Sequence, residues 1–268
     1  MFKFKLPDNV LAFTTSRRCE GGTFGVDART LGIHEDDVCI PPARLVIPRQ
    51  THSTKVSYVN ASSSAGAASA ARQEEGARPS SAPATEAHET LSGVDAVWTD
   101  TPELCVAVKT ADCIPVLLYD QRQQRVAAIH AGWRGTVGHI VTRTIEAMQS
   151  CGADLHAIIG PGISLDAFEV GDEVYDAFSQ AGFPMQRIAR RYPAPTSSEP
   201  CTMSLESTKW HLDLWEANRW LLLESGIPAS HIQVSGICTY SHLSQLYSAR
   251  QETIHTGRNL NGIMLRPQ

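Results

Sequence analysis

Cys113 and His130 are the two residues whose types and positions point most directly to chemistry. Cys113 stands in TADC, directly before an apolar run, and His130 ends another apolar run and precedes Ala-Gly-Trp-Arg-Gly. His52, in RQTHSTKV, lies far away in the sequence. A thiolate and two imidazoles suit zinc, and three protein ligands leave a fourth position open, as in catalytic zinc sites. Zinc in such a site can supply activated water at neutral pH.

The residue types leave two other interpretations open. Cys113 can be a small core residue with both histidines hydrogen-bonded locally, because free cysteine is among the most buried residue types. Cys113 can also be a metal-free nucleophile with His130 as its base. The neighbouring Asp112 would point to the opposite face of a strand. We therefore expect Asp112 to accept hydrogen bonds from backbone or arginine.

The AGWRG stretch after His130 indicates a turn that can approach a ligand. Gly132 and Gly135 permit a tight turn or a close backbone approach. Arg134 is a candidate anion clamp, with an ordinary surface arginine as the alternative. Trp133 either stacks on a flat ligand or anchors the core.

Composition limits the classes of protein to consider. The chain has 268 residues and a net charge of −5, which gives no reason to expect a nucleic-acid partner. We find no apolar run near the roughly 18–20 residues of a membrane helix, and no signal-peptide pattern at the N-terminus. Seven cysteines, an odd number, together with the lack of an export signal favour reduced thiols in the cytoplasm. The absence of a CxxC pair disfavours a zinc ribbon or a thioredoxin-type redox motif.

The elements that must position these residues alternate between strands and helices. Residues 114–119 and 126–129 predict two strands of an antiparallel hairpin, which brings Cys113 and His130 to one end of a sheet. Thr136 is expected to cap a helix that continues through Met148, with Gly152 as its stop. Further elements are predicted as strands at 104–108, 157–159, 232–237 and 262–265 and as helices at 172–180 and 213–225, the last begun by a capping box of Asp213 and Glu216.

These elements predict one α/β domain over residues 1–268. We expect a layered sandwich with a mixed, largely antiparallel sheet and flanking helices. Residues 60–90 are rich in Ala, Ser, Pro and Glu and predict a polar low-complexity insert on the surface. A second polar stretch, residues 190–207, predicts a loop.

Several catalytic motifs are absent from the sequence. It contains no GxxxxGK[ST] loop, no HExxH, no GxSxG and no HxE followed by PCxxC. Its ten histidines include no HxH pair. A multicopper oxidase would need paired histidines for a further copper cluster, so the histidine pattern disfavours that class.

Five longer stretches resemble the YfiH-type family, whose members carry the names laccase-domain polyphenol oxidase and purine nucleoside phosphorylase. The stretches are TADCIPVLLYD, VAAIHAGWRGT, IIGPGISLDAFEVGDEV, LDLWEANRWLLLESGI and CTYSHLSQLYSARQETIHTGRN. The resemblance implies a YfiH-like α/β layered sandwich. It also implies a metal held by His52, Cys113 and His130, which would be the catalytic residues. Zinc is the expected metal, with copper as the alternative.

The resemblance implies phosphorolysis of adenosine, inosine and methylthioadenosine, and hydrolytic deamination of adenosine. Arg134, Arg250 and Arg258 are our candidates for binding phosphate, because guanidinium groups hold phosphate by paired hydrogen bonds. The small-molecule partners would be a nucleoside and phosphate, with no nucleic acid and no membrane. An amidase acting on a peptidoglycan precursor and a copper-dependent polyphenol oxidase are the alternatives.

Two positions depart from the family pattern. Gly162 stands where the family usually has cysteine, and Gln251 stands where it usually has a second arginine. We expect these differences to affect substrate preference and to leave the three metal ligands intact. The sequence does not indicate an oligomeric state.

Overall fold

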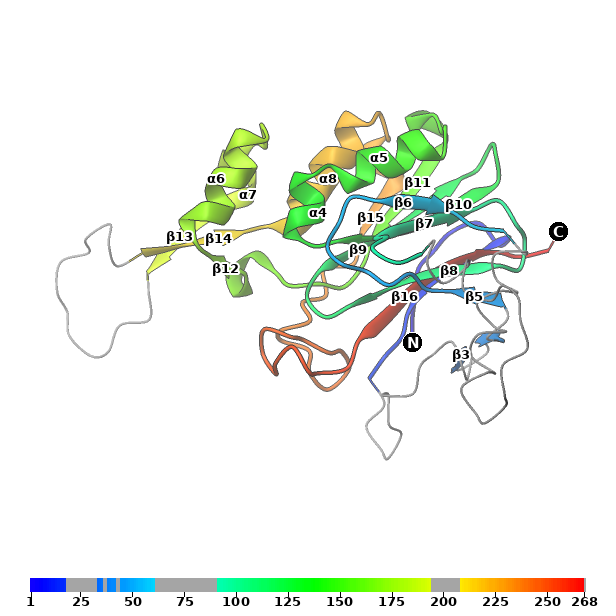
Figure 1. Cartoon of the computed structure of the whole chain (residues 1–268), viewed down its shortest axis with the longest axis horizontal. Coiled ribbons are helices and arrows are strands. Elements are labelled where there is room, and N and C mark those ends of the chain that lie inside the picture. Colours follow the sequence, from blue (N-terminus) through cyan, green and yellow to red (C-terminus); the bar gives the residue numbers. More distant parts are fainter. Residues whose placement is uncertain (18–32, 36–37, 42–43, 61–90, 194–207, 268) are drawn as a thin grey trace, which may run out of the picture.

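The structure is a computed structural model that describes residues 1–17, 33–35, 38–41, 44–60, 91–193 and 208–267. It forms a layered α/β sandwich in which two sheets pack face to face and helices cover the outer face of one of them (Figure 1). The predicted fold class is confirmed.

The strands in chain order are β1 (Phe2–Lys3), β2 (Val10–Thr14), β3 (Ile33–Glu35), β4 (Val38–Ile40), β5 (Leu45–Val46), β6 (Val56–Tyr58), β7 (Ala96–Thr99), β8 (Cys105–Thr110), β9 (Ile114–Asp120), β10 (Arg125–Ala131), β11 (Leu155–Ile159), β12 (Glu169–Val170), β13 (Ala189–Pro193), β14 (Thr208–Leu212), β15 (Ile232–Val234) and β16 (Asn259–Leu265). The helices are α4 (Trp133–Val137), α5 (Ile140–Ala147), α6 (Asp172–Gln180), α7 (Met185–Ile188) and α8 (Leu214–Glu224). Short 3₁₀ segments are η2 (Gly152–Asp154), η3 (Leu165–Ala167) and η5 (Ala229–His231).

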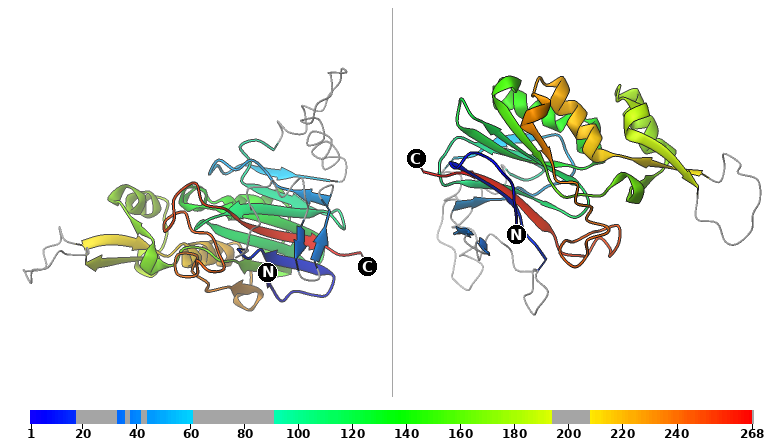
Figure 2. Two further views of the ribbon diagram at one scale, coloured as in Figure 1. Left: turned by 90° about the horizontal axis from the view of Figure 1, so that it is seen from below. Right: turned by 180° about the vertical axis from the view of Figure 1, so that it is seen from behind.

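The larger sheet has the order β15-β11-β9-β10-β7-β6, and α4, α5 and α8 lie across its outer face (Figures 1 and 2). Its outermost pairs, β11 with β15 and β6 with β7, are parallel, and the inner pairs are antiparallel. The hairpin of β9 and β10 is confirmed, with Asp120 opposite Arg125 at the turn. The mixed, largely antiparallel character of the sheet is confirmed as well.

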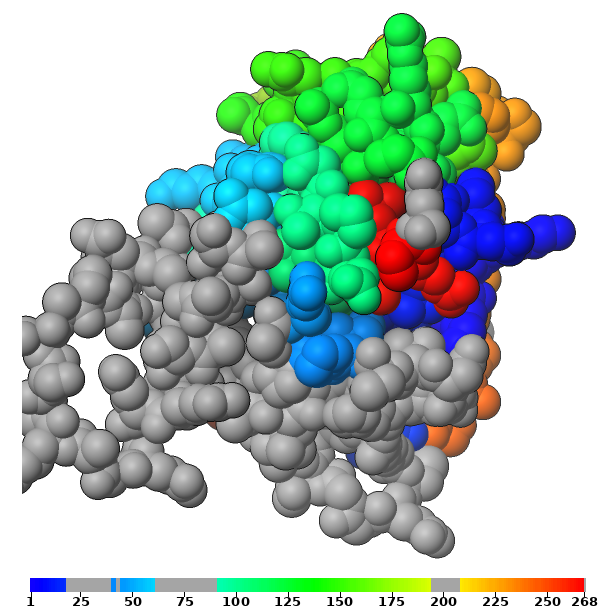
Figure 3. Space-filling model, turned by 90° about the vertical axis from the view of Figure 1, so that its right-hand side faces the viewer, coloured from blue at the N-terminus to red at the C-terminus, as the bar shows by residue number. Residues whose placement is uncertain are grey.

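The second sheet has the order β1-β2-β16-β8-β5. Figure 3 shows residues of the C-terminal end (red) between the N-terminal segment (blue) and the chain near residue 105 (green), as this strand order requires. The pleat of β8 sends Val106 and Val108 into the core between the sheets and Ala107 to the outer face. Strand β9 likewise divides its residues, with Leu117 between the sheets and Val116 under the helices. Both faces of β9 are therefore buried, which explains its continuous apolar run.

A third sheet, β12-β14-β13, projects from the body together with α6 and α7 (Figure 2). Residues 190–193 were predicted as part of a loop at 190–207, but they belong to strand β13, so that part of the prediction is wrong. The sequence there lacks the apolar–polar alternation of a half-buried strand, because Arg190 and Arg191 are both exposed. The rest of that stretch, 194–207, and nearly all of the predicted insert at 60–90 lie outside the described residues.

The prediction of one continuous helix from Thr136 through Met148 is wrong. The chain forms α4 and α5 instead, separated by Gly138 and His139, and His139 has a left-handed φ of 58°. A Cβ at Gly138 would lie 2.4 Å from Cγ2 of Thr54, so the break lets the chain pass close to the loop that carries His52. The helix ends at Ala147, before the predicted stop at Gly152.

Helix α8 begins where the sequence predicts. The Asp213 carboxylate accepts a hydrogen bond of 2.9 Å from the backbone N–H of Glu216, which confirms the predicted N-cap.

Within the described ranges, no helix is both long and apolar enough to cross a membrane.

Asn261→Ala should destabilise the fold, because Asn261 joins three strands in the core. Its buried amide accepts from the Thr14 hydroxyl (2.7 Å) and donates to the Thr110 hydroxyl (3.0 Å). Loss of both bonds should lower the free energy of unfolding by about 2–4 kcal/mol, since buried hydroxyls lose their partners. Urea unfolding measures this. Asn9→Ala, at a half-buried amide, is the control and should lower it by about 1 kcal/mol or less; equal effects would contradict this account.

Candidate metal centre

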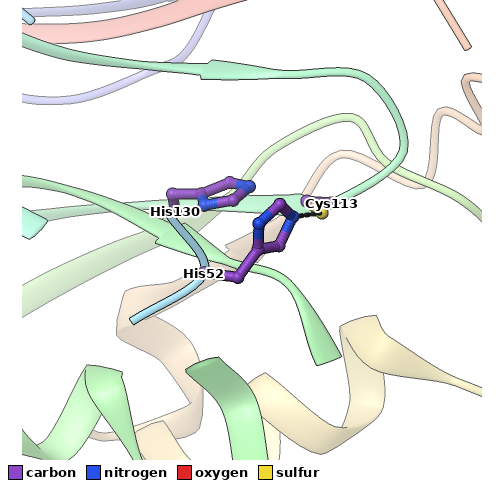
Figure 4. A group of neighbouring side chains, drawn as sticks. All are labelled: His52, Cys113 and His130. Carbon is purple, nitrogen blue, oxygen red and sulfur yellow. Dashed lines mark hydrogen bonds between the residues drawn. The ribbon is translucent and has the colours of Figure 1, made fainter. Parts of the chain in front are cut away.

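Three side chains from distant parts of the sequence point toward one another (Figure 4). Cys113 directly precedes β9, His130 lies near the end of β10, and His52 comes from the loop between β5 and β6. One ligand atom from each residue lies within 4.8 Å of the others. Sγ of Cys113 is 3.8 Å from Nε2 of His52, and the two imidazole rings meet edge to face at 4.9 Å between centroids. The structure thus brings together all three residues singled out in the sequence.

The fully buried Asp95 orients His130. Nδ1 of His130 lies 2.7 Å from Oδ1 of Asp95, and the backbone N–H of His130 donates to the Asp95 carbonyl. The Nδ1 proton is therefore committed to the carboxylate, and Nε2 is the nitrogen left to face the cluster. A carboxylate behind a ligating histidine is the arrangement that sets ring tautomer and direction in protein metal sites.

The same carboxylate holds the loop that carries His52. Asp95 accepts hydrogen bonds from the backbone N–H groups of Thr51 (3.1 Å), His52 (3.0 Å) and Ser53 (2.7 Å), and from the Ser53 hydroxyl (2.7 Å). His52 has a φ of 61°, a left-handed conformation that is unfavourable for a residue with a side chain. The converging N–H groups require that conformation, so Asp95 stabilises it.

Gln50 fixes the loop from the other side. Its amide donates to the carbonyl of Lys109 and accepts from the N–H of Lys109, both at 2.8 Å. This pair of bonds joins the His52 segment to β8, four residues before Cys113. The positions of His52 and Cys113 are thereby coupled through the backbone.

Gly132 lies against the cluster. A Cβ at this position would be 2.9 Å from Sγ of Cys113 and 3.1 Å from Cδ2 of His52. The AGWRG backbone therefore approaches Cys113 and His52 closely, and its approach to a ligand stays a prediction.

Asp112 accepts hydrogen bonds from other protein groups, as expected from the sequence. Its carboxylate accepts from the Thr239 hydroxyl and from the backbone N–H of Arg250, both at 2.6 Å. Asp112 thus secures the loop that carries Arg250 and does not contact the His130 ring, which is held by Asp95.

Charges within the cluster shift the titration of its members. Burial by itself raises the pKa of the Cys113 thiol, but His130 and His52 outweigh this and lower that pKa to about 6. Burial by itself lowers the pKa of His130, but Cys113 and Asp95 raise it to about 9. For Asp95, burial is outweighed by hydrogen bonds from His130 and Ser53, and its pKa falls to about 2. Both shifts favour a thiolate beside an imidazolium when no metal is bound, and binding a cation would release the Nε2 proton.

The donor set fits a tetrahedral metal ion. With Zn–S near 2.3 Å and Zn–N near 2.0–2.1 Å, two ligand atoms lie about 3.3–3.6 Å apart. Sγ of Cys113 and Nε2 of His52 are 3.8 Å apart and the three ligand atoms lie within 4.8 Å of one another, so side-chain movements on the order of 1 Å would complete the geometry. Zinc and copper both accept thiolate and imidazole ligands, so the donor set does not choose between them.

The cluster opens into a pocket of about 720 Å³. Arg250 and Arg258, two of the three predicted phosphate-binding residues, line it. Arg134 is not among the lining residues; it is exposed, and its guanidinium lies 4.2 Å from the centroid of the Trp133 ring. The lining also includes apolar side chains, among them Trp133, Phe168 and Ile163.

Four residues at or near the site were not among the candidates predicted from the sequence. Arg49 and Lys109 line the pocket, and Gln50 and Asp95 hold its loops. Arg49 and Gln50 stand directly before the THS stretch, so their proximity to His52 was the available signal. Asp95 and Lys109 gave none, because only the sheet topology brings them near the cluster.

The two positions that depart from the family pattern, Gly162 and Gln251, lie in different surroundings. A Cβ at Gly162 would lie 2.3 Å from Cδ1 of Ile114, so the Ile114 side chain occupies the space that a larger residue would need. Gln251 is exposed and is not among the pocket residues.

Asp95→Asn should weaken metal binding. An amide can point its NH₂ group at His130 or at the backbone N–H groups of the loop, so some of the present bonds must be lost. We expect the affinity for Zn²⁺ to fall about 10–100-fold, as for other partners of ligating histidines. Competition with a chromophoric chelator measures it. Asp100→Asn, at an exposed aspartate that is hydrogen-bonded to Tyr58, is the control. Equal Zn²⁺ affinities for the two variants would contradict the role of Asp95 in metal binding.

Gly132→Ala should displace Cys113 and His52, because the new Cβ occupies their space. We expect Zn²⁺ affinity to fall at least about tenfold, since small errors in ligand placement reduce binding. Gly135→Ala is the matched control, because a Cβ there meets its nearest atoms at an ordinary 3.4 Å. Wild-type affinity in Gly132→Ala would show that the cluster tolerates the contact.

The comparisons with known proteins agree with this architecture. The family described as multi-copper polyphenol oxidoreductase laccase matches residues 28–266. A purine nucleoside phosphorylase of Bacteroides thetaiotaomicron is 42% identical over 228 residues, 84% of this chain and 74% of that protein. The adenosine deaminase RL5, from an unknown prokaryotic organism, is 37% identical over 239 residues, 88% of this chain and 78% of that protein.

A solved structure shares the fold. YlmD from Geobacillus stearothermophilus superposes with a TM-score of 0.71 at 27% identity, covering 97% of this chain and 93% of that one. The family match spans far more than half of the sequence, and the YfiH-type resemblance is confirmed. The chain therefore belongs to the laccase-like, YfiH-type family described as multi-copper polyphenol oxidoreductase laccase.

Proposed function

We propose that this protein is a zinc-dependent purine nucleoside enzyme that catalyses phosphorolysis of adenosine, inosine and methylthioadenosine and hydrolytic deamination of adenosine. The single observation that carries the proposal is the cluster of His52, Cys113 and His130 at the wall of a pocket of about 720 Å³. That volume is typical of sites for small organic ligands. Relatives named purine nucleoside phosphorylase and adenosine deaminase support this substrate class.

The residues of the cluster have separate tasks in this proposal. Cys113, His130 and His52 hold the metal, and Asp95 keeps Nε2 of His130 directed at it. A zinc ion bound there supplies a Lewis acid and lowers the pKa of the water that it binds. The three ligands leave one coordination position for water or substrate.

The pocket wall suits a purine. Trp133 and Phe168 line it together with Ile163. Aromatic and apolar side chains stabilise a flat heterocycle by stacking and by excluding water. In deamination, water adds at C6 of adenine and ammonia leaves. In phosphorolysis, a phosphate oxygen attacks C1′ of the ribose and the purine leaves through N9.

The family name keeps copper-dependent oxidation of phenols as a second candidate. Cys and His ligands bind copper as well as zinc, and divalent affinities generally favour copper. The described part of the chain holds a single cluster of three potential metal ligands, and we propose that it serves zinc. An amidase acting on a peptidoglycan precursor would use the same residues. We also propose a cytoplasmic location, where Cys113 would stay reduced.

The decisive experiment tests adenosine with and without phosphate on protein of known metal content. We expect adenine and ribose 1-phosphate only with phosphate, and inosine without it. Cys113→Ala should lose its bound zinc and at least about a hundredfold in both activities, because it lacks one metal ligand and the thiolate. Chromatography identifies the products. Cys151→Ala, at an exposed free cysteine, is the matched control and should keep both activities.

Other outcomes separate the candidates. Zinc binding without any turnover of adenosine would reject the purine substrates and leave the metal site. Oxidation of phenols by copper-loaded protein, with zinc-loaded protein inactive on nucleosides, would favour the oxidase. Full activity in Cys113→Ala would contradict the role of the cluster.

A further inference from the structure

One apolar side chain of the pocket wall is exposed to solvent. Ile254 lines the pocket and is 73% exposed, more than any other large hydrophobic residue in the described ranges. Single exposed apolar side chains are ordinary on a protein surface. Three others, Tyr58, Val234 and Tyr240, are exposed as well, but none of them is among the pocket residues. Ile254 differs from them because it borders a space that a ligand can fill.

The backbone around Ile254 is held in place by polar contacts. The Arg258 guanidinium donates to the carbonyl of Ile254 (2.8 Å). The Glu252 carboxylate accepts from the Thr256 hydroxyl (2.8 Å) and forms an ion pair with Arg17 (2.6 Å). None of these contacts uses the Ile254 side chain. The segment therefore keeps an isoleucine at the pocket for a reason other than the stability of the segment itself.

The pocket wall changes from buried to open between the metal cluster and Ile254. His130, in the cluster, is 4% exposed, and the wall residue Ile163 is buried. In the free protein, water contacts most of Ile254. A ligand group that covers this side chain removes apolar surface from water, which is favourable when the group itself is apolar. Ile254 thus favours ligands whose outer end is apolar.

The chemistry at the cluster decides which end of a nucleoside lies outermost. In deamination, water adds at C6, so the purine must lie with C6 at the metal ligands. C6 and the 5′ carbon are at opposite ends of adenosine. With C6 at the cluster, the 5′ substituent of the ribose therefore extends away from the metal ligands.

We propose that Ile254 is a specificity-determining residue, which contacts the ribose 5′ substituent and favours an apolar group there over a hydroxyl. The inference rests on the proposed nucleoside function and ranks the substrates of that function. An apolar contact the size of a methylene changes kcat/KM by about tenfold or more. We therefore expect 5′-methylthioadenosine to be preferred about tenfold over adenosine, with 5′-deoxyadenosine between them.

The first test is competition between two nucleosides in one reaction, which gives the ratio of their kcat/KM values directly. On zinc-loaded protein, Ile254→Thr should lower the ratio of 5′-methylthioadenosine to adenosine about fivefold or more. Ile254→Val should lower it about twofold or less, because the apolar contact is largely kept. Valine and threonine are both β-branched and have the same shape, so this pair of variants isolates the polarity of the side chain.

Val234→Thr is the matched control. It introduces the same hydroxyl at an exposed residue of β15 that does not line the pocket, and it should leave the ratio within about twofold of wild type. Zinc content and melting temperature check that every variant is folded with an intact cluster. Both should match wild type, because Ile254 is exposed and substitutions at exposed positions have small effects on stability.

Equilibrium dialysis with the same three nucleosides separates this inference from the proposed function. Binding in the expected order without turnover, with the order lost in Ile254→Thr, would keep the role of Ile254 and reject the proposed reactions. Turnover of adenosine with no preference for 5′-methylthioadenosine, or with a preference that Ile254→Thr retains, would overturn the role of Ile254 and leave the proposed function. If wild-type protein neither binds nor converts any of the three, both are overturned.

Discussion

The site depends on one buried carboxylate. Asp95 accepts hydrogen bonds from the His130 ring, from three consecutive backbone N–H groups at residues 51–53, and from the Ser53 hydroxyl. A buried charge is strongly unfavourable unless it is fully hydrogen-bonded, and here every donor also belongs to the metal cluster or its loop. The same bonds that make burial of Asp95 tolerable therefore fix the directions of two of the three candidate ligands.

The sheets supply the third ligand and the link between all of them. Strand β8 ends at Thr110 and β9 begins at Ile114, so Cys113 lies in the short connection between the two packed sheets. Both faces of β9 and the inner face of β8 are buried, which leaves the connection little freedom to move. Gln50 joins the His52 loop to β8. Gly132, after β10, has no side chain, so the His52 loop and Cys113 can pack against it.

The pocket combines two chemical characters. A thiolate and two imidazoles form a donor set for a soft or borderline metal. The lining also includes the cationic residues Arg49, Lys109, Arg250 and Arg258, and aromatic and aliphatic side chains that provide a surface for a flat ring. A family with this donor set can bear the names of both copper oxidases and nucleoside enzymes, because thiolate and imidazole bind copper and zinc alike.

The sequence by itself determined the strands and helices whose apolar residues recur with a regular spacing. It also identified the residues whose side chains can bind a metal or take part in catalysis. The β9–β10 hairpin, the Asp213 cap and the candidates His52, Cys113 and His130 follow from local spacing and residue type. Tertiary structure decided which groups meet those residues. Asp95 and Lys109 carry no local signal, because their partners lie far away in the sequence. The break at Gly138 also came from packing, since only the approach of the His52 loop to that turn requires glycine there.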